Sequence, residues 1–291
     1  MSLFLREARS QEEDAQKPEP AAISGVWDLA RGHRLFRLRL LDEARNAAFR
    51  HTPGQFVMLS VLGAGEAPIS VSSSPTRAGA IEVCVRQVGR VTGALFRLRE
   101  NALVGLRGPY GNGFPMEAMA GGHLLIVAGG LGMAPLRSLL WYVLDRRHEF
   151  GRVVLLNGAR TPRDIQFKDE MTGLTQRSDI QTRLIVESAT PSEETGPWNG
   201  SVGLITDLVK DLDPEMRSAY VTVCGPPVMY RFVLAELLGR GFDGDRIFVS
   251  LERKMRCGIG KCAHCTVGHK YACIHGPVFT YWDTLNLPEM I

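Results

Sequence analysis

The stretch HLLIVAGGLGMAPLRSLLWYVL, residues 123 to 144, combines an apolar run, a glycine-rich turn and a second apolar run. Its length suits a membrane span, but three glycines, a proline and the charged Arg137 interrupt it. A buried strand, a glycine turn and a buried helix account for the same pattern without placing a charge in lipid. We therefore predict a strand-turn-helix unit of a parallel sheet, in a chain without a membrane span.

The same alternation of strand and helix continues on the C-terminal side of this unit. From residue 119 to 250, apolar strands such as RVVLLNGAR and AYVTVCGPP alternate with amphipathic helices, which predicts an α/β parallel-sheet domain with helices on both faces. Residues 23 to 118 contain short alternating strands separated by Gly and Pro, typical of a small antiparallel barrel or sandwich, and we expect an antiparallel β-barrel. Residues 1 to 22 predict a flexible polar tail, and residues 251 to 291 form a C-terminal loop extension.

Composition agrees with two folded domains. The chain has 291 residues, of which 45% are hydrophobic and 22% charged, and this argues against general disorder. A formal net charge of +3 predicts binding neither to nucleic acid nor to a membrane. The N-terminus carries charges throughout and lacks the apolar core of a secretory signal, so we expect a cytoplasmic, reducing location. Clustered cysteines in that setting indicate metal ligands rather than disulfides.

Four of the six cysteines lie in one short segment, RCGIGKCAHCTVGHKYACIHGPVF, residues 256 to 279. Cys257, Cys262 and Cys265 follow the C-x4-C-x2-C spacing of plant-type 2Fe-2S ferredoxin loops, and Cys273 supplies a fourth thiol. Glycines inside the loop allow the chain to curl around a cluster and to direct amide N–H groups toward its sulfurs. The spacing favours a 2Fe-2S cluster held by these four cysteines.

Two other metal sites fit parts of the same segment. Four cysteines also satisfy tetrahedral zinc, although zinc ribbons usually offer two C-x2-C pairs and only one is present. A Rieske-type site would use His264 and a second histidine, whereas four cysteines are already available. Residues 252 to 273 carry a local net charge of +4, which either stabilises thiolates and docks an acidic partner or is a solvated surface.

A second group of candidates lies at the ends of two predicted parallel strands. Gly130-x-Gly132-x-x-Pro135 stands between a strand and a helix, where a pyrophosphate can approach the backbone, although a plain tight turn gives the same letters. The fourth strand ends in CGPP, residues 224 to 227, at the carboxyl edge, where open α/β sheets bind ligands. Cys84 is interpreted as a small buried residue, and Cys224 could be one too.

Together these motifs resemble the ferredoxin-NADP reductase superfamily. The resemblance rests on stretches in the same order along nearly the whole chain after residue 23: GQF (54 to 56), ISVSS (69 to 73), GPYGNGF (108 to 114), AGGLGMAPL (128 to 136), WNGSVGLIT (198 to 206), CGPPVM (224 to 229) and the cysteine segment. The chain is most similar to the branch with a C-terminal 2Fe-2S loop. That branch contains the gamma subunits of cytoplasmic nickel-iron hydrogenases and sulfhydrogenases, the corresponding subunit of anaerobic sulfite reductase, and the electron-transfer subunit of dihydroorotate dehydrogenase.

The resemblance implies an FAD site in the barrel. The family's Arg-x-Tyr/Phe-Ser flavin motif aligns with residues 67 to 70, where only Ser70 matches, and its second flavin turn aligns with Gly89 to Thr92. The flavin-binding candidates implied in this way are Gln55, Ser70, Val71, Ser72, Gly89, Val91, Thr92, Gly108 and Gly111.

The resemblance also implies an NAD(P)H site in the α/β domain. Gly130, Gly132, Pro135, Gly225 and Pro226 map to it, with Cys224 as the catalytic candidate beside the nicotinamide. Arg160, in GARTPRD, lies where selectivity for the adenine ribose is set. Either Arg160 or Arg163 could pair with a 2′-phosphate, or both could be surface charges, so the choice between NADH and NADPH stays open.

The function implied is an electron-transfer subunit that links NAD(P)H, FAD and a 2Fe-2S cluster to a partner redox subunit. The gap of seven residues between Cys265 and Cys273 resembles the hydrogenase gamma and sulfite reductase members more than the dihydroorotate dehydrogenase members. Two other functions remain open at this point. One is a zinc-binding regulator that keeps the fold without electron transfer, and the other is a self-sufficient reductase of a small acceptor.

Overall fold

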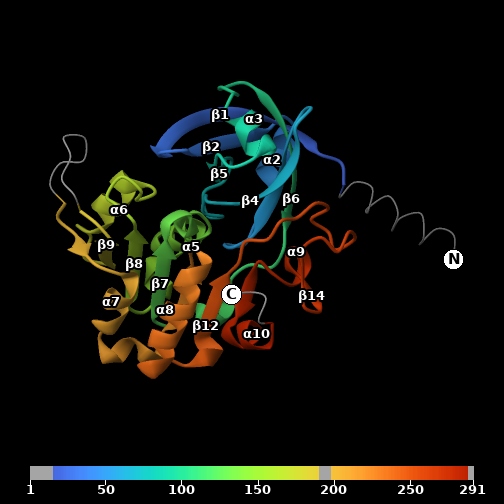
Figure 1. The fold of residues 1–291 in the computed structure, drawn as a ribbon. Coiled ribbons are helices and arrows are strands. Elements are labelled where there is room, and N and C mark those ends of the chain that lie inside the picture. The colour runs from blue at the N-terminus through green and yellow to red at the C-terminus, as the bar shows by residue number, and fades with distance from the viewer. Residues whose placement is uncertain (1–15, 190–197, 288–291) are drawn as a thin grey trace.

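The structure is a computed structural model that describes residues 16–189 and 198–287, so most of the predicted N-terminal tail lies outside the described residues. Two β-sheets form the two main domains, and the C-terminal extension, red in Figure 1, runs alongside β6 of the first sheet and β12 of the second. The predicted fold class, an antiparallel β-barrel with an α/β parallel-sheet domain and a C-terminal cysteine extension, is confirmed.

The first domain is an antiparallel six-stranded sheet with the order β4-β3-β6-β1-β2-β5. A bridge between Val71, just after β4, and Val83 of β5 joins the two edge strands and closes the barrel. In β2, Phe36, Leu38 and Leu40 point inward while the arginines between them face outward, as the sequence alternation predicts. The strands are β1 (Glu19–Ala30), β2 (His33–Leu40), β3 (Phe56–Val61), β4 (Gly65–Ser70), β5 (Ile81–Arg86) and β6 (Leu103–Tyr110).

Strand β1 begins at Glu19, four residues before the predicted start of the barrel. Residues 19 to 22 pair in antiparallel register with residues 103 to 106 of β6, and Ala21 is fully buried. The two prolines in KPEPAA obscured this strand, but Pro20 stands near its first residue, where a missing N–H is tolerated. The sheet therefore includes the end of the stretch predicted to be a tail.

The second domain is a seven-stranded sheet with the order β10-β9-β8-β7-β11-β12-β15. All neighbouring strands are parallel except β12 and β15. The chain leaves β7 toward β8 on one side and reaches β11 on the other, so the strand order reverses between β7 and β11, where ligands of such sheets bind. The strands are β7 (Leu124–Gly129), β8 (Val153–Ala159), β9 (Gln181–Val186), β10 (Ser201–Val202), β11 (Tyr220–Cys224), β12 (Ile247–Ser250) and β15 (Val278–Thr280).

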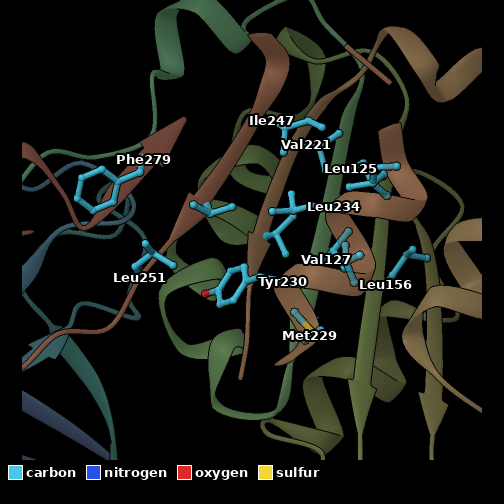
Figure 2. Close-up of a cluster of buried hydrophobic side chains, with 14 of the residues drawn as sticks. Leu125, Val127, Leu156, Val221, Met229, Tyr230, Leu234, Ile247, Leu251 and Phe279 are labelled. Atoms are coloured by element: carbon cyan, nitrogen blue, oxygen red, sulfur yellow. The ribbon is translucent and has the colours of Figure 1, made fainter. Parts of the chain in front are cut away.

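Helices cover both faces of this sheet because side chains of β7 alternate between two cores. Leu124 and Ile126 pack with α5 (Met133–Asp145) and α6 (Lys168–Leu174), whereas Leu125 and Val127 pack with α7 (Ile205–Lys210) and α8 (Pro227–Gly239). Figure 2 shows the second core, in which Tyr230 and Leu234 of α8 meet strands β7, β11 and β12. Truncating one such leucine to alanine typically costs about 2–5 kcal/mol of folding free energy.

The remaining helices and strands are short. They are α2 (Glu43–Ala48), α3 (Arg90–Leu95), α4 (Met116–Met119), α9 (Ala272–His275), α10 (Tyr281–Asn286), the 3-10 turns η1 (Gly130–Gly132), η2 (Arg147–Glu149), η3 (Pro214–Ser218) and η4 (Gly244–Arg246), and the hairpin of β13 (Thr266–Val267) and β14 (Lys270–Tyr271). Among the described residues, no helix has the length and apolarity that crossing a membrane requires.

The C-terminal extension is tied to both domains. Its strand β15 pairs antiparallel with β12 and so becomes the edge of the parallel sheet. On the barrel side, the Asn112 amide donates to the carbonyls of His275 (3.1 Å) and Val278 (2.8 Å), and its oxygen accepts from the Val278 N–H (3.0 Å). The extension is thus part of the folded body rather than an appended loop.

Candidate functional site: a nucleotide edge, a barrel turn and a cysteine loop

The predicted nicotinamide candidates meet at the carboxyl ends of β7 and β11. A side chain at Gly132 would place its Cβ 2.1 Å from the Cys224 carbonyl oxygen, so only glycine fits there. Gly130 has a left-handed φ of 52°, a conformation that favours glycine, and the space beside its Cα is open. Pro135 lies in the first turn of α5, where its missing N–H costs no helix hydrogen bond. This cradle fits a pyrophosphate next to backbone N–H groups.

Cys224 lies at the end of β11 with 2% of its surface exposed. Its thiol donates to the Ser250 carbonyl (3.3 Å), and the Tyr230 hydroxyl donates to the same carbonyl (2.5 Å) while accepting from the Gly225 N–H (3.2 Å). Figure 2 shows the Tyr230 hydroxyl pointing from α8 toward the segment that carries Leu251. Burial raises the pKa of the Cys224 thiol to about 12, so at neutral pH it is a protonated donor and not a thiolate nucleophile.

Arg160 and Pro226 stand at the same carboxyl edge. Arg160 follows β8, its side chain is exposed, and its carbonyl accepts from the Ser188 N–H (3.0 Å), which joins the ends of β8 and β9. Pro226 precedes α8 as its N-cap residue. The structure thus gathers the nicotinamide candidates along one edge of the sheet.

The flavin candidates lie around β4 and α3, which pack against each other. Ser70 ends β4, and the Ser72 hydroxyl is buried without a hydrogen-bond partner among the described residues. An unpaired buried hydroxyl needs a partner, and a ligand polar atom would supply one. The Thr92 hydroxyl accepts from the N–H groups of Val88 (3.0 Å) and Gly89 (2.9 Å), so it caps its own helix. Val91 is half-buried in the first turn of α3, where the backbone N–H groups of a helix have no intrahelical acceptor.

Gln55, Gly108 and Gly111 have structural roles in the barrel. The Gln55 amide donates to the Gly111 carbonyl (2.7 Å), and its oxygen accepts from the Thr52 N–H (2.8 Å). Gly108 and Gly111 have φ values of 121° and 75°. A Cβ at Gly111 would lie 2.6 Å from the Gly276 carbonyl oxygen, so this glycine allows the extension to pack on the barrel. Val71 is buried and bridges to Val83.

The four clustered cysteines lie in and next to one loop, residues 256 to 265, which we call the cluster loop. Cys262 is exposed, Cys257 half-buried, and Cys265 and Cys273 buried. Gly258 and Gly260 have φ values of 76° and 74°, so the loop makes the left-handed turns expected of it. The Gly260 N–H donates to the Cys273 sulfur (3.1 Å), the kind of contact that stabilises a metal-bound thiolate.

The donor set fits an iron-sulfur cluster by its chemistry and its loop. Burial opposes ionisation of Cys257, but hydrogen bonds from loop N–H groups bring its pKa down to about 7; burial raises the pKa of Cys273 to about 12. Within the described ranges, no group of three or more His, Cys, Asp or Glu side chains is already arranged as a metal site.

Several residues of this region were missed from the sequence. Arg107 of β6 is 5% exposed and bonds both to Glu66 and to the cluster loop. Although burial opposes its charge, Glu66 raises the pKa of the Arg107 guanidinium above its ordinary value. The only sequence signal was a charged residue in the apolar strand LVGLRGPY. Tyr230, whose hydroxyl donates to the same carbonyl as the Cys224 thiol, gave no sequence signal, because it resembles the other apolar positions of α8.

Comparisons with known proteins agree with this geometry. Residues 21–114 match the model of the oxidoreductase FAD-binding domain, and residues 126–235 match that of the oxidoreductase NAD-binding domain. Residues 252–285 match the iron-sulfur cluster binding domain of dihydroorotate dehydrogenase B. The sulfhydrogenase 2 subunit gamma of Pyrococcus furiosus is 44% identical over 282 residues, covering 93% of this chain and 97% of the relative. The chain belongs to the ferredoxin-NADP reductase superfamily, in the branch with a C-terminal iron-sulfur domain.

Two further similar proteins share less sequence with the chain. A probable dihydroorotate dehydrogenase B (NAD(+)) electron transfer subunit of Pyrococcus furiosus is 32% identical over 265 residues, covering 91% of each chain. The solved structure of the NADH-dependent reduced ferredoxin-NADP oxidoreductase has a TM-score of 0.71 at 23% identity and covers 92% of this chain and 91% of its own. At that identity the likeness shows the fold. As a member of this branch, the protein is an electron-transfer flavoprotein subunit with NAD(P)H-dependent oxidoreductase domains and an iron-sulfur domain.

Proposed function

We propose that this protein passes electrons between NAD(P)H and a partner redox subunit through FAD and a 2Fe-2S cluster. The observation that carries the proposal is that one folded body unites the three sites, since the C-terminal extension pairs with β12 and bonds to the barrel at Asn112 and Arg107. Bound flavin exchanges two electrons with nicotinamide and single electrons with an iron-sulfur centre. The protein supplies binding, orientation and exclusion of water.

We assign a separate set of residues to the nicotinamide site and to the flavin site. Gly130 and Gly132 admit the pyrophosphate of NAD(P)H, and Gly225 with Pro226 shapes the nicotinamide end. Cys224 presents a neutral thiol beside the nicotinamide, and the hydrogen bond that this thiol donates to the Ser250 carbonyl oxygen holds it in place. In the barrel, Ser70 and Ser72 with the first turn of α3 hold the flavin. The unpaired Ser72 hydroxyl supports this assignment.

The type of cluster is part of the proposal. The C-x4-C-x2-C spacing with a fourth cysteine supports 2Fe-2S, with Cys257, Cys262, Cys265 and Cys273 as ligands. Chemical analysis of the anaerobically purified protein should find equal amounts of iron and acid-labile sulfide, two of each per chain. A higher content would indicate another cluster, and zinc in place of iron would exclude this one.

The partner is proposed to be a hydrogenase or a sulfur or sulfite reductase subunit. The relative named sulfhydrogenase 2 subunit gamma is 44% identical, against 32% for the dihydroorotate dehydrogenase relative. A dihydroorotate dehydrogenase partner is the second candidate, because the matching cluster-domain model carries that name. We further propose a cytoplasmic location, where the six free cysteines would stay reduced.

A diaphorase assay tests the core of the proposal. The holoprotein should reduce a one-electron viologen dye with NADH or NADPH as electron donor. In the variant with Cys262 replaced by serine, NAD(P)H should still bleach the flavin, but electrons should no longer reach the dye by way of the cluster. The proposal would be contradicted if neither NADH nor NADPH bleached the flavin of the wild-type protein.

A further inference from the structure

One buried arginine links the barrel to the cluster loop. Arg107, Met58 and Pro68 occupy opposite positions on neighbouring strands β6, β3 and β4, so they form a row on one face of the sheet. Met58 belongs to the same buried cluster as Met255, Cys265 and Cys273, and not to the barrel core. This face of the barrel is therefore covered by the C-terminal extension.

The Arg107 guanidinium connects three segments. Nε and Nη2 donate to the two oxygens of Glu66 at 3.0 and 2.7 Å, which gives a bidentate pair with β4. Nη1 donates to the carbonyl oxygen of Cys257 at 3.0 Å and reaches the Tyr110 hydroxyl at 3.4 Å. Cys257 is the first predicted cluster ligand, so the contact is made where the cluster loop begins.

The next loop residue lies directly on the barrel. A Cβ on Gly258 would be 3.0 Å from the Tyr110 ring and 3.1 Å from the Met58 side chain, so the loop backbone approaches both side chains closely. Gly258 also has a φ of 76°, which a side chain would strain. Arg107 and this glycine contact together hold the loop against the barrel.

An arginine is an unusual choice for this position. Its side chain is 4% exposed, and apolar residues of similar volume often stabilise a protein as well as a buried ion pair does. The planar guanidinium, however, can bond a carboxylate with two N–H groups and still direct a third group elsewhere. Here that third direction meets the Cys257 carbonyl, a contact that neither lysine nor an apolar residue reproduces in full.

We propose that Arg107 is a positioning residue that fixes the cluster loop against the flavin-binding barrel. Glu66 lies on β4, the strand that ends at the flavin candidate Ser70. One continuous set of contacts therefore runs from the flavin strand through Glu66 and Arg107 to the first cluster ligand, and it sets the separation of the two redox groups. This inference rests on the proposed function for its consequence, but the anchoring contact can be tested without it.

The test compares Arg107→Met with Arg107→Lys in the holoprotein, using hydrogen exchange and stopped-flow spectroscopy. A hydrogen bond from a charged donor contributes about 1.5–3 kcal/mol, so amide exchange in residues 256 to 262 should become roughly ten- to a hundredfold faster in Arg107→Met. Arg107→Lys keeps the buried charge and should fold, with an intermediate exchange rate. Flavin reduction by NADH should keep its wild-type rate in both variants, while cluster reduction slows.

Arg45→Met is the control, a bidentate arginine at the exposed surface of the same barrel. Arg45 also makes a bidentate pair with a barrel carboxylate, since it donates to Glu19 on β1 at 3.0 and 2.6 Å. Its loss should leave exchange in the cluster loop unchanged. Wild-type loop exchange in both Arg107 variants would overturn the proposal, as would equal slowing of flavin and cluster reduction. If the wild-type protein fails to oxidise NAD(P)H, the proposed function is wrong. The hydrogen-exchange data still test whether Arg107 holds the cluster loop against the barrel.

Discussion

Replacing Arg137 by methionine removes a buried cation from the interface between the two main domains. Arg137 lies on α5, and its side chain is 8% exposed. Its Nη1 donates to Glu82 of the barrel (2.8 Å) and to the Ser72 carbonyl (3.0 Å), while Nε and Nη2 donate to Glu170 of α6 (2.8 and 2.7 Å). All four hydrogen bonds are lost in the variant.

The size of the effect follows from the surroundings of the two carboxylates. Removing one partner of a buried ion pair typically costs about 3–5 kcal/mol. Glu82 still has Arg37, and the Glu170 side chain is 30% exposed, so we expect the lower end, about 3 kcal/mol at neutral pH. Arg183→Met is the control, because its pair with Asp211 is more exposed, and its loss should cost about 1 kcal/mol or less.

The loss should also depend on pH. Burial opposes the charge of Glu82, but Arg137 holds the pKa of this carboxyl below its ordinary value of 4.5. A carboxyl with a depressed folded-state pKa stabilises the protein above its ordinary pKa, and this contribution is lost as the pH falls through the folded-state value. The difference in unfolding free energy between wild type and Arg137→Met should therefore shrink below pH 4.5.

Urea-induced unfolding of the holoproteins, followed by far-ultraviolet circular dichroism, measures both effects. The wild type, Arg137→Met and Arg183→Met are compared at neutral pH and in acid, at equal ionic strength. The reasoning is refuted if Arg137→Met destabilises no more than Arg183→Met, or if its cost is the same at both pH values.

Three further predictions concern the sites themselves. Gly132→Ala would place a methyl group 2.1 Å from the Cys224 carbonyl oxygen, and overpacking of this kind costs about 1–3 kcal/mol of free energy. If the displaced backbone loses about 1.4 kcal/mol of NADH binding, KM for NADH should rise roughly tenfold in the dye assay. Gly173→Ala is the control, since a Cβ there meets no atom within 4 Å, and it should leave KM unchanged. Cys262→Ser should lower iron content, whereas Cys84→Ala should retain it, because Cys84 is buried on β5, outside the cluster loop. If Arg160 binds a 2′-phosphate, Arg160→Gln should raise KM for NADPH roughly tenfold or more, since a charge-assisted hydrogen bond contributes about 1.5–3 kcal/mol. KM for NADH should stay unchanged. Equal changes in KM for both nucleotides would exclude that role.

Much of the fold could be predicted because local patterns decide it. The alternation of apolar strands and amphipathic helices after residue 119 predicted helices on both faces of the sheet, and the two cores on either side of β7 confirm it. The glycine turn between strand and helix was predicted too, whereas the close approach of Gly132 to the Cys224 carbonyl became visible only in the structure. The spacing of Cys257, Cys262 and Cys265 predicted a tight loop with left-handed glycines, and Cys273 lies outside it in α9.

Other features depend on contacts between distant residues and left little trace in the sequence. The three residues of β15 are too few to show a strand pattern, and their antiparallel pairing with β12 depends on the path of the whole extension. Thr92 could be located at a helix start, but not the fact that its hydroxyl caps its own turn. The contact of Arg107 with Cys257 joins residues 150 positions apart, and no local pattern predicts such a pair.

The central claim is that nicotinamide, flavin and an iron-sulfur cluster form one electron-transfer path in this chain. Anaerobic visible and paramagnetic resonance spectra of freshly purified protein, recorded before and after addition of NADH or NADPH, test it most directly. The account predicts bleaching of the flavin followed by the signal of a reduced 2Fe-2S cluster. A colourless protein that contains zinc and no iron would contradict it.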